Sequence, residues 1–154
     1  MKVLVQRVNH AACVVDGKTI GEIGEGLLLY VGFRQGDDAS SLPKMAKKVA
    51  NLRIFEDKQG KMNLSVLDTS KAVLSISQFT LEAATKKGHR PSFTDALEPI
   101  QAEKLYDAFN RLLNQEGLSV ETGSFQAMMQ IHSINDGPVT LLLERRDKDD
   151  TKTY

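Results

Sequence analysis

Three uncharged hydrogen-bonding side chains gather at the end of a short apolar run. Residues 72–76 have the β-branched, apolar composition typical of a strand. Ser77, Gln78 and Thr80 follow, around Phe79. Burying such groups without partners costs about 1–3 kcal/mol each, so the strand end must satisfy them. They therefore indicate either a capped strand end, with hydroxyls bonded to the backbone, or a site that faces a ligand.

A second stretch, Asp136-Gly137-Pro138, places a proline between two strand-like segments. Proline removes a hydrogen-bond donor from a sheet, so it belongs at a turn or at the start of a strand. The simplest interpretation is a hairpin turn with a trans peptide bond, because only about 5–6% of X–Pro bonds in folded proteins are cis. The sequence alone does not distinguish the two isomers.

Several other chemistries have no support in the residue spacing. His10, His89 and His132 are far apart and form no ligand pair, and Cys13 is the single cysteine. No nucleophile elbow, dinucleotide-binding glycine motif or P-loop is present. A nucleophile at Ser77 or Thr80 would need a neighbouring base, which the spacing does not identify. We therefore expect neither a metal nor a cofactor.

Composition limits the class of partner. The 154 residues include 20 Lys+Arg and 20 Asp+Glu, so the formal net charge is zero. This balance argues against non-specific binding along a nucleic-acid backbone, but it permits recognition of one RNA end and offers little resistance to self-association. With no signal peptide and no long apolar run, we expect a cytoplasmic protein without membrane attachment. One domain over 1–145 and a charged tail over 146–154 are predicted.

Two helices are predicted. The first begins near 38–41 with Pro43 in its first turn, and its apolar stripe is Leu42, Met45, Ala46, Val49 and Leu52. The second spans about 99–115 and ends before Gly117, with Ala102, Leu105, Phe109, Leu112 and Leu113 facing inward. Lys44, Lys47 and Lys48 lie off the first stripe and are interpreted as solvated surface, with phosphate binding as the alternative. A polar loop follows the 72–81 stretch and clusters Lys86, Lys87, His89 and Arg90.

The remaining patterns predict strands, with a hairpin turn at Asp16-Gly17. Their expected ranges are 2–8, 11–15, 19–23, 27–33, 53–55, 62–66, 72–76, 118–122, 125–134 and 139–143. Two helices among so many strands indicate a mixed α/β domain. We expect the helices to cover one sheet face and a second sheet layer to lie on the other side.

The two polar stretches together carry a family resemblance. Ser77 to Leu81, paired with Asn135 to Thr140, resembles the D-aminoacyl-tRNA deacylase family of the homodimeric bacterial and eukaryotic type. Further matching pieces occur in the family's order: Gln6 to Val8, Gly21 to Gly24, Arg53 to Phe55, Met62 to Leu64 and Arg90 to Phe93. The resemblance runs from Gln6 to about Leu143. It departs at Gln126 and Met128, where the family more often has a small and an acidic residue.

The resemblance implies a hydrolase that cleaves the ester between a D-amino acid and the 3′-terminal adenosine of tRNA. It implies a cis Gly137–Pro138 bond that reaches into the active site of the other subunit. Two backbone carbonyls there would exclude an L side chain yet admit glycine, so glycyl-tRNA is an expected substrate. Gly137 suits this role because a β-carbon would crowd the ligand.

The resemblance also assigns the site. Ser77, Gln78, Phe79 and Thr80 form the catalytic stretch, and Gly137, Pro138, Arg7 and Phe125 bind the substrate, with Arg7 holding the Gly137 backbone. Either Thr80 is the nucleophile, or the ribose 2′-OH of the substrate assists while backbone N–H groups near Phe79 and Thr80 stabilise the oxyanion. We favour the second. The rival functions are a non-catalytic RNA- or nucleotide-binding dimer and a small-molecule esterase that uses Ser77 or Thr80.

Overall fold

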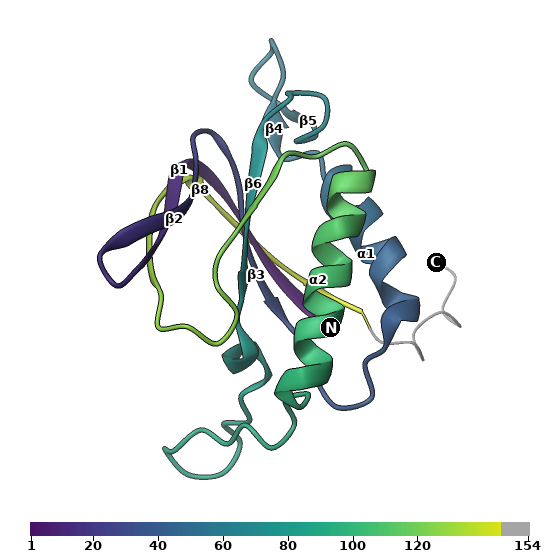
Figure 1. Cartoon of the computed structure of the whole chain (residues 1–154). Coiled ribbons are helices and arrows are strands. Elements are labelled where there is room, and N and C mark those ends of the chain that lie inside the picture. The colour runs from purple at the N-terminus through teal and green to yellow at the C-terminus, as the bar shows by residue number, and fades with distance from the viewer. Residues whose placement is uncertain (146–154) are drawn as a thin grey trace.

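A computed structural model describes residues 1–145 (Figure 1). The predicted tail, 146–154, lies outside the described residues. The elements in chain order are β1 (Lys2–Val15), β2 (Lys18–Ile23), β3 (Gly26–Gly32), the 3₁₀ helix η1 (Ala39–Ser41), α1 (Leu42–Ala50), β4 (Phe55–Glu56), β5 (Met62–Leu64), β6 (Ala72–Ser77), the 3₁₀ helix η2 (Phe79–Glu82), α2 (Pro99–Gln115), β7 (Val120–Thr122) and β8 (Gln130–Glu144).

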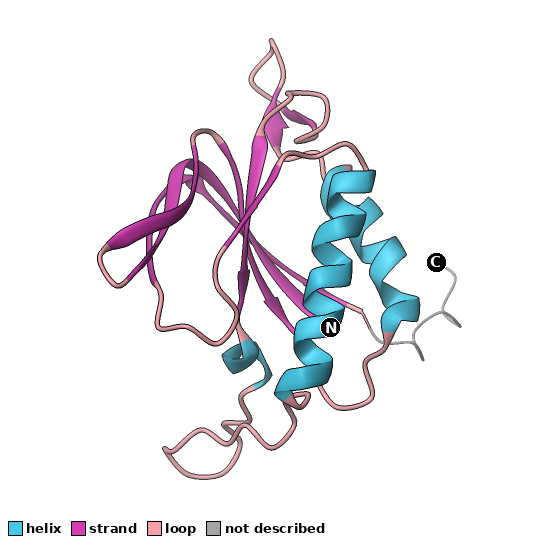
Figure 2. Cartoon of the chain, viewed as in Figure 1, coloured by secondary structure: helices cyan, strands magenta, loops and turns pink. Residues whose placement is uncertain are grey.

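Six of the strands form one mixed sheet, in the order β2-β1-β3-β6-β7, with β8 paired to β1. The β3–β6 and β6–β7 pairs are parallel, and the other pairs in this sheet are antiparallel. Strands β4 and β5 form a separate small sheet, and both α-helices lie on one side of the main sheet (Figure 2). The predicted mixed α/β class is confirmed, and the second sheet is this two-stranded one.

Both helices begin where the sequence predicts, and α2 also ends there, whereas α1 ends at Ala50, so that Leu52 of the predicted stripe lies beyond it. The Asp38 side chain accepts a hydrogen bond from the Ser40 N–H and caps the turn that leads into α1. Glu98 caps α2 by accepting from the Gln101 N–H at 2.8 Å, and Gly117, with φ +99°, follows its last turn. The apolar stripe of α1 is buried from Leu42 to Val49.

The strand β3 separates two apolar cores. Leu27 and Leu29 face the core beneath the helices, where Phe109 and Leu113 of α2 are also buried. Leu28 faces the other core, with Cys13, Ile23, Leu74 and Ile76 among its buried members. This second core is enclosed because the sheet curls: a β-carbon at Gly21 of β2 would come within 2.7 Å of the Thr122 carbonyl oxygen of β7. The main sheet therefore covers much of its own far face.

Several predictions about strands and turns are wrong. The ranges 2–8 and 11–15 form one strand, β1, because β8 pairs with both of its halves. The predicted strand 125–134 begins only at Gln130; before it, the Ala127 N–H bonds to the Ser124 carbonyl in a turn. The expected hairpin turn at 135–138 is instead a bulge within β8. Residues 136–139 lie opposite Arg7 alone, between the pairs Gln6–Thr140 and Val8–Asn135.

Candidate functional site

The polar strand end lies where β6 gives way to η2. Ser77 is the last residue of β6, and the Gln78 N–H donates to the Val31 carbonyl of β3 at 2.8 Å. The Gln78 side-chain amide donates to the Thr80 hydroxyl at 2.5 Å, so the partner of this hydroxyl is a side chain and not the backbone that the capped strand end would have used. The N–H groups of Phe79 and Thr80, the first two of η2, have no hydrogen-bond acceptor within residues 1–145. Two backbone donors thus remain available to a ligand.

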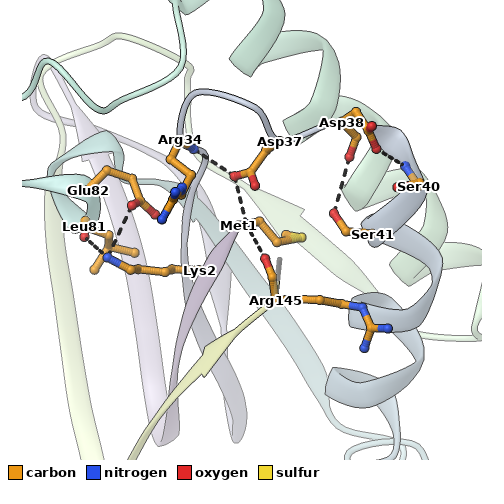
Figure 3. Close-up of polar contacts among 10 residues, drawn as sticks. All are labelled: Met1, Lys2, Arg34, Asp37, Asp38, Ser40, Ser41, Leu81, Glu82 and Arg145. Atoms are coloured by element: carbon orange, nitrogen blue, oxygen red, sulfur yellow. Dashed lines mark hydrogen bonds and ion pairs between the residues drawn. The ribbon is translucent and has the colours of Figure 1, made fainter. Parts of the chain in front are cut away.

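Strand β1 anchors η2 from its other end. The Lys2 ammonium donates to the Leu81 carbonyl at 3.0 Å and pairs with the Glu82 carboxylate at 3.2 Å (Figure 3). The Glu82 side chain is buried, and Lys2 is its only cationic partner that we identify among the described residues. Beside this contact, the Met1 ammonium pairs with Asp37 at 2.8 Å. The first two residues of the chain therefore fix η2 and the loop before α1.

A cavity of about 660 Å³ opens next to this strand end. Ser77, Gln78 and Phe79 line it on one side, and Phe125 with the loop that follows lines it on another. Phe93 adds a further wall, and its ring packs edge-to-face against Phe79 at 5.3 Å between centroids. Phe79 is 55% exposed, so its ring remains available for contact. Thr80 does not line this cavity.

The wall behind the cavity is held by a residue that sequence reasoning missed. The Tyr106 hydroxyl of α2 donates to the Ser75 carbonyl of β6 at 2.7 Å, and its ring lies 6.0 Å from that of Phe125. Burial raises the pKa of Tyr106 above its ordinary value. Its position four residues after Ala102, on the same helix face, was the signal that could have found it.

The second polar stretch forms the bulge of β8. The Gly137–Pro138 peptide bond is cis, as the family resemblance implied, and both residues are exposed. Gly137 has φ +118°, and a β-carbon there would lie 2.8 Å from Cγ2 of Val139 and 3.1 Å from Nη2 of Arg7. Only glycine fits this position without displacing its neighbours.

Arg7 supports this bulge from below. Its side chain is buried, with the residue 6% exposed, and Nη1 donates to the Ile54 carbonyl at 2.7 Å. Nε pairs with the Asp136 carboxylate at 3.0 Å. The guanidinium thus joins the chain before β4 to the bulge, and the structure brings Arg7 and Gly137 together as the resemblance implied.

The two polar stretches do not meet within one chain. Strands β1 and β3 separate β8 from β6, and Arg7 is in register with Val73 rather than with Ser77. Strands are about 4.8 Å apart and rise about 3.3 Å per residue, which places Gly137 on the order of 20 Å from Ser77. One chain therefore holds Ser77 to Thr80 with Phe125 in one place, and Arg7, Gly137 and Pro138 in another.

Two further features of the described residues concern ligands and membranes. Residues 1–145 contain no group of three or more His, Cys, Asp or Glu side chains placed to hold a metal ion. Neither helix in this part of the chain has the length and apolar character needed to cross a bilayer.

Comparison with known proteins identifies the family. The sequence model described as D-Tyr-tRNA(Tyr) deacylase matches residues 4–144. The chain is 52% identical to a D-aminoacyl-tRNA deacylase of Lactobacillus acidophilus, over 94% of this chain and 99% of that protein. It is 53% identical to a D-aminoacyl-tRNA deacylase of Bacillus cereus, over 95% of this chain and all of the relative.

Two solved structures share the fold. One, titled c-Myc DNA Unwinding Element Binding Protein, superposes with a TM-score of 0.89 at 41% identity, covering 95% of this chain and 99% of the other. The other, titled as a probable eukaryotic D-amino acid tRNA deacylase, has a TM-score of 0.81 at 16% identity, covering 92% and 97%, and shows the fold alone.

The mixed α/β fold, the cavity at the end of β6 and these relatives define an enzyme of the hydrolase class. More particularly, the chain belongs to the D-Tyr-tRNA(Tyr) deacylase family. The sequence-based recognition is confirmed.

Proposed function

We propose that this protein hydrolyses the ester between a D-amino acid and the 3′-terminal adenosine of tRNA, as the names of its relatives describe for them. The observation that carries this proposal is the cavity at the end of β6, which Phe79 lines, together with the backbone N–H groups of Phe79 and of the next residue, Thr80, which are unpaired within residues 1–145. Such donors stabilise the negative charge that develops on a carbonyl oxygen during acyl transfer. Exposed Phe79 and half-buried Phe125 offer rings for contact with the adenine. An enzyme with this substrate would act in the cytoplasm.

The missing part of the site is supplied by a second copy of the chain. Gly137 and Pro138 project from β8, whose only paired neighbour among the described strands is β1. Apolar side chains are exposed along the same strand, with Ile134 59% and Leu142 54% exposed. A two-fold dimer would bury these side chains and bring the bulge of one chain to the cavity of the other. A sedimentation run that finds a stable, active monomer at micromolar concentration would contradict this arrangement.

In that dimer, the Gly137–Pro138 backbone rejects L-aminoacyl substrates. Backbone carbonyls facing the aminoacyl Cα would collide with an L side chain, whereas a D side chain points away. The filter is rigid, because Arg7 holds the bulge through the Ile54 carbonyl and Asp136. Glycine has no side chain to collide, so glycyl-tRNA is also a substrate.

The substrate supplies the catalytic hydroxyl. The Thr80 hydroxyl bonds to the Gln78 amide, which cannot accept its proton as a base, and within residues 1–145 no hydrogen bond joins Thr80 to a histidine or carboxylate. The ribose 2′-OH then assists hydrolysis while the N–H groups of Phe79 and Thr80 hold the oxyanion. Thr80→Ala should keep substantial activity. A tRNA ending in 2′-deoxyadenosine should react about 10²–10³-fold more slowly, the scale seen when one positioned group is lost. A dead Thr80→Ala enzyme with full activity on the deoxy substrate would establish Thr80 as the nucleophile.

Release of D-tyrosine from D-Tyr-tRNA by the pure protein is the test of the proposed function. L-Tyr-tRNA serves as the stereochemical control, and a simple aryl ester serves as the control for a small-molecule esterase that uses Ser77 or Thr80. We expect turnover of D-Tyr-tRNA alone. Equal turnover of the aryl ester would favour the general esterase.

A second candidate function is nucleic-acid binding without turnover. The structural relative at 41% identity is titled as a DNA unwinding element binding protein. Tight binding of nucleic acid with no release of D-tyrosine in the same assay would favour this alternative.

A further inference from the structure

The loop between η2 and α2 concentrates positive charge beside the cavity. Lys86, Lys87 and Arg90 are exposed in this loop, and its sequence has no acidic residue between Glu82 and Asp95. The chain as a whole has a formal net charge of zero. The loop therefore carries a local excess of positive charge on a chain whose formal net charge is zero.

The base of the loop is fixed to the cavity wall while its tip extends away. The backbones of Ala84 and Ser92 exchange two hydrogen bonds, of 2.8 and 3.0 Å. The Gln35 side chain, in the segment after β3, donates to the Thr94 carbonyl at 2.6 Å and so fixes the residues that follow the loop. Figure 1 shows the segment between η2 and α2 projecting beyond the rest of the domain. The three cations thus lie on an extension of the wall that contains Phe93.

Exposed aromatic rings connect the charged tip to the cavity. The Phe79–Phe93 pair lies at the foot of the loop, and both rings are exposed as well as lining the cavity. Cations that follow a backbone, together with exposed aromatic rings, are the combination by which proteins bind single-stranded nucleic acid. Phe79 already contacts the terminal adenine in the proposed function, whereas the three cations and Phe93 have no part in it.

We propose that the loop over residues 84–92 binds the phosphates of the unpaired 3′ segment of an RNA whose terminal nucleoside occupies the cavity. Lys86, Lys87 and Arg90 contact the phosphates, and Phe93 contacts a base that precedes the terminal nucleoside. This inference rests on the proposed function for the identity of the RNA. It adds a binding surface that runs from Phe93, in the cavity wall, to the tip of the loop, with no part in the chemistry.

A second basic surface provides the comparison. Lys44, Lys47 and Lys48 of α1 line a groove of about 820 Å³ between α1 and the end of β8. This groove has no aromatic lining residue, and it contains Glu144 and the exposed Leu142. The α1 lysines are therefore a matched set of three cations at a site that lacks the stacking surface.

The test measures fluorescence anisotropy of a labelled, single-stranded RNA oligonucleotide ending in CCA, at several salt concentrations. The loop variant replaces Lys86, Lys87 and Arg90 by Gln, and the control variant replaces Lys44, Lys47 and Lys48 by Gln. We expect the loop variant to lose roughly 3- to 100-fold in affinity at low salt, the range for three exposed ion pairs. The slope of log affinity against log salt should fall by up to about 2, since each single-strand phosphate contact contributes about 0.7. The control should bind like the wild type.

Unchanged affinity and slope in the loop variant would overturn the inference, as would undetectable binding by the wild type or a larger loss in the α1 control. Hydrolysis of a D-aminoacyl ester of adenosine, which has no phosphate, should be the same in the loop variant and the wild type. If the wild type binds the oligonucleotide but hydrolyses neither this ester nor D-Tyr-tRNA, the proposed function fails while the binding surface stands.

Discussion

The end of β6 and the bulge of β8 differ in shape and in support. Residues 77–79 line a cavity, and the segment from Gln78 to Glu82 is anchored by its own chain, through Val31 and Lys2. Gly137 and Pro138 project from an edge strand, with Arg7 beneath them and the Asn135 side chain bonded across the bulge to the Val139 N–H and the Thr140 hydroxyl. The end of β6 is a cavity that is open to solvent, and the bulge of β8 is an exposed projection with no cavity beside it in the described part of the same chain. In the proposed function each region is half of a site, and the two halves come from two chains.

The largest loss of activity is expected from a substitution in the bulge of β8. Gly137→Ala places a methyl group 2.8 Å from Val139 and 3.1 Å from Arg7, at a φ of +118° that L residues rarely adopt. The bulge must shift, and a displacement of about 1 Å costs on the order of 10²-fold in rate. We expect this loss in kcat/KM for D-Tyr-tRNA, or an equivalent loss of discrimination against L-Tyr-tRNA. Wild-type kinetics with both substrates would disprove the filter.

A smaller effect is expected from the support beneath the bulge. Arg7→Lys keeps the charge but cannot reach both the Ile54 carbonyl and Asp136 in the geometry of a guanidinium. Losing one buried hydrogen bond costs about 1–3 kcal/mol, so kcat/KM for the D substrate should fall about tenfold. Steady-state kinetics measure the fall in kcat/KM, and urea unfolding of the same preparation measures the loss of stability. A rate that survives intact would show that the bulge does not need Arg7.

The anchoring of η2 beside the cavity is tested by replacing Lys2. Lys2→Met removes the partner of buried Glu82 and frees the Leu81 carbonyl, so η2 loses its anchor. We expect kcat to fall several-fold with little change in KM, and the free energy of unfolding to fall by about 1–3 kcal/mol. Lys2→Arg should restore most of kcat. The matched control is Lys71→Met, which breaks the exposed pair with Glu25 and should leave the kinetics unchanged.

Many of the helices and strands could be predicted from the sequence, and the wrong predictions have physical causes. The helix α2 was predicted at both ends because Pro99 opens it and Gly117 closes it, which are local signals. The long strand β1 was divided because polar residues such as Gln6 interrupt its apolar pattern. Its continuity comes from pairing with β8, residues far away in the chain. Local propensity contains no information about such a partner.

The candidate site shows the same limit. The motifs at 77–80 and 135–138 could be read from the sequence, but their separation depends on sheet order, which no motif encodes. The strand predicted over 125–134 failed because alternating apolar residues such as Phe125 and Met129 imitate a strand pattern. Gln126, with φ +62°, and Met128, 92% exposed, instead belong to a loop at the cavity.

The smallest effect is expected from Tyr106, which packs against Phe125 behind the cavity. Tyr106→Phe removes the hydrogen bond to the Ser75 carbonyl, which still accepts from the Gly123 N–H, so the free energy of unfolding should fall by about 1 kcal/mol at neutral pH. Because burial raises the pKa of Tyr106, the unfolded chain ionises first as the pH rises. Stability from this group is therefore complete below about pH 10 and declines above it. Urea unfolding from pH 7 to pH 11 should show a weaker alkaline decline in the variant, and an identical decline would contradict the assignment to Tyr106.

Complementation between two defective chains tests most directly whether the halves come from different copies. One chain carries Ala127→Trp, which fills the cavity, and the other carries Gly137→Val, which distorts the bulge. Each variant alone should be inactive. In a purified heterodimer one site combines both defects, while the other combines an intact cavity with an intact bulge. The account predicts about half of the wild-type activity per dimer on D-Tyr-tRNA. A heterodimer as inactive as its two parents would contradict it, because each site would then be built from a single chain.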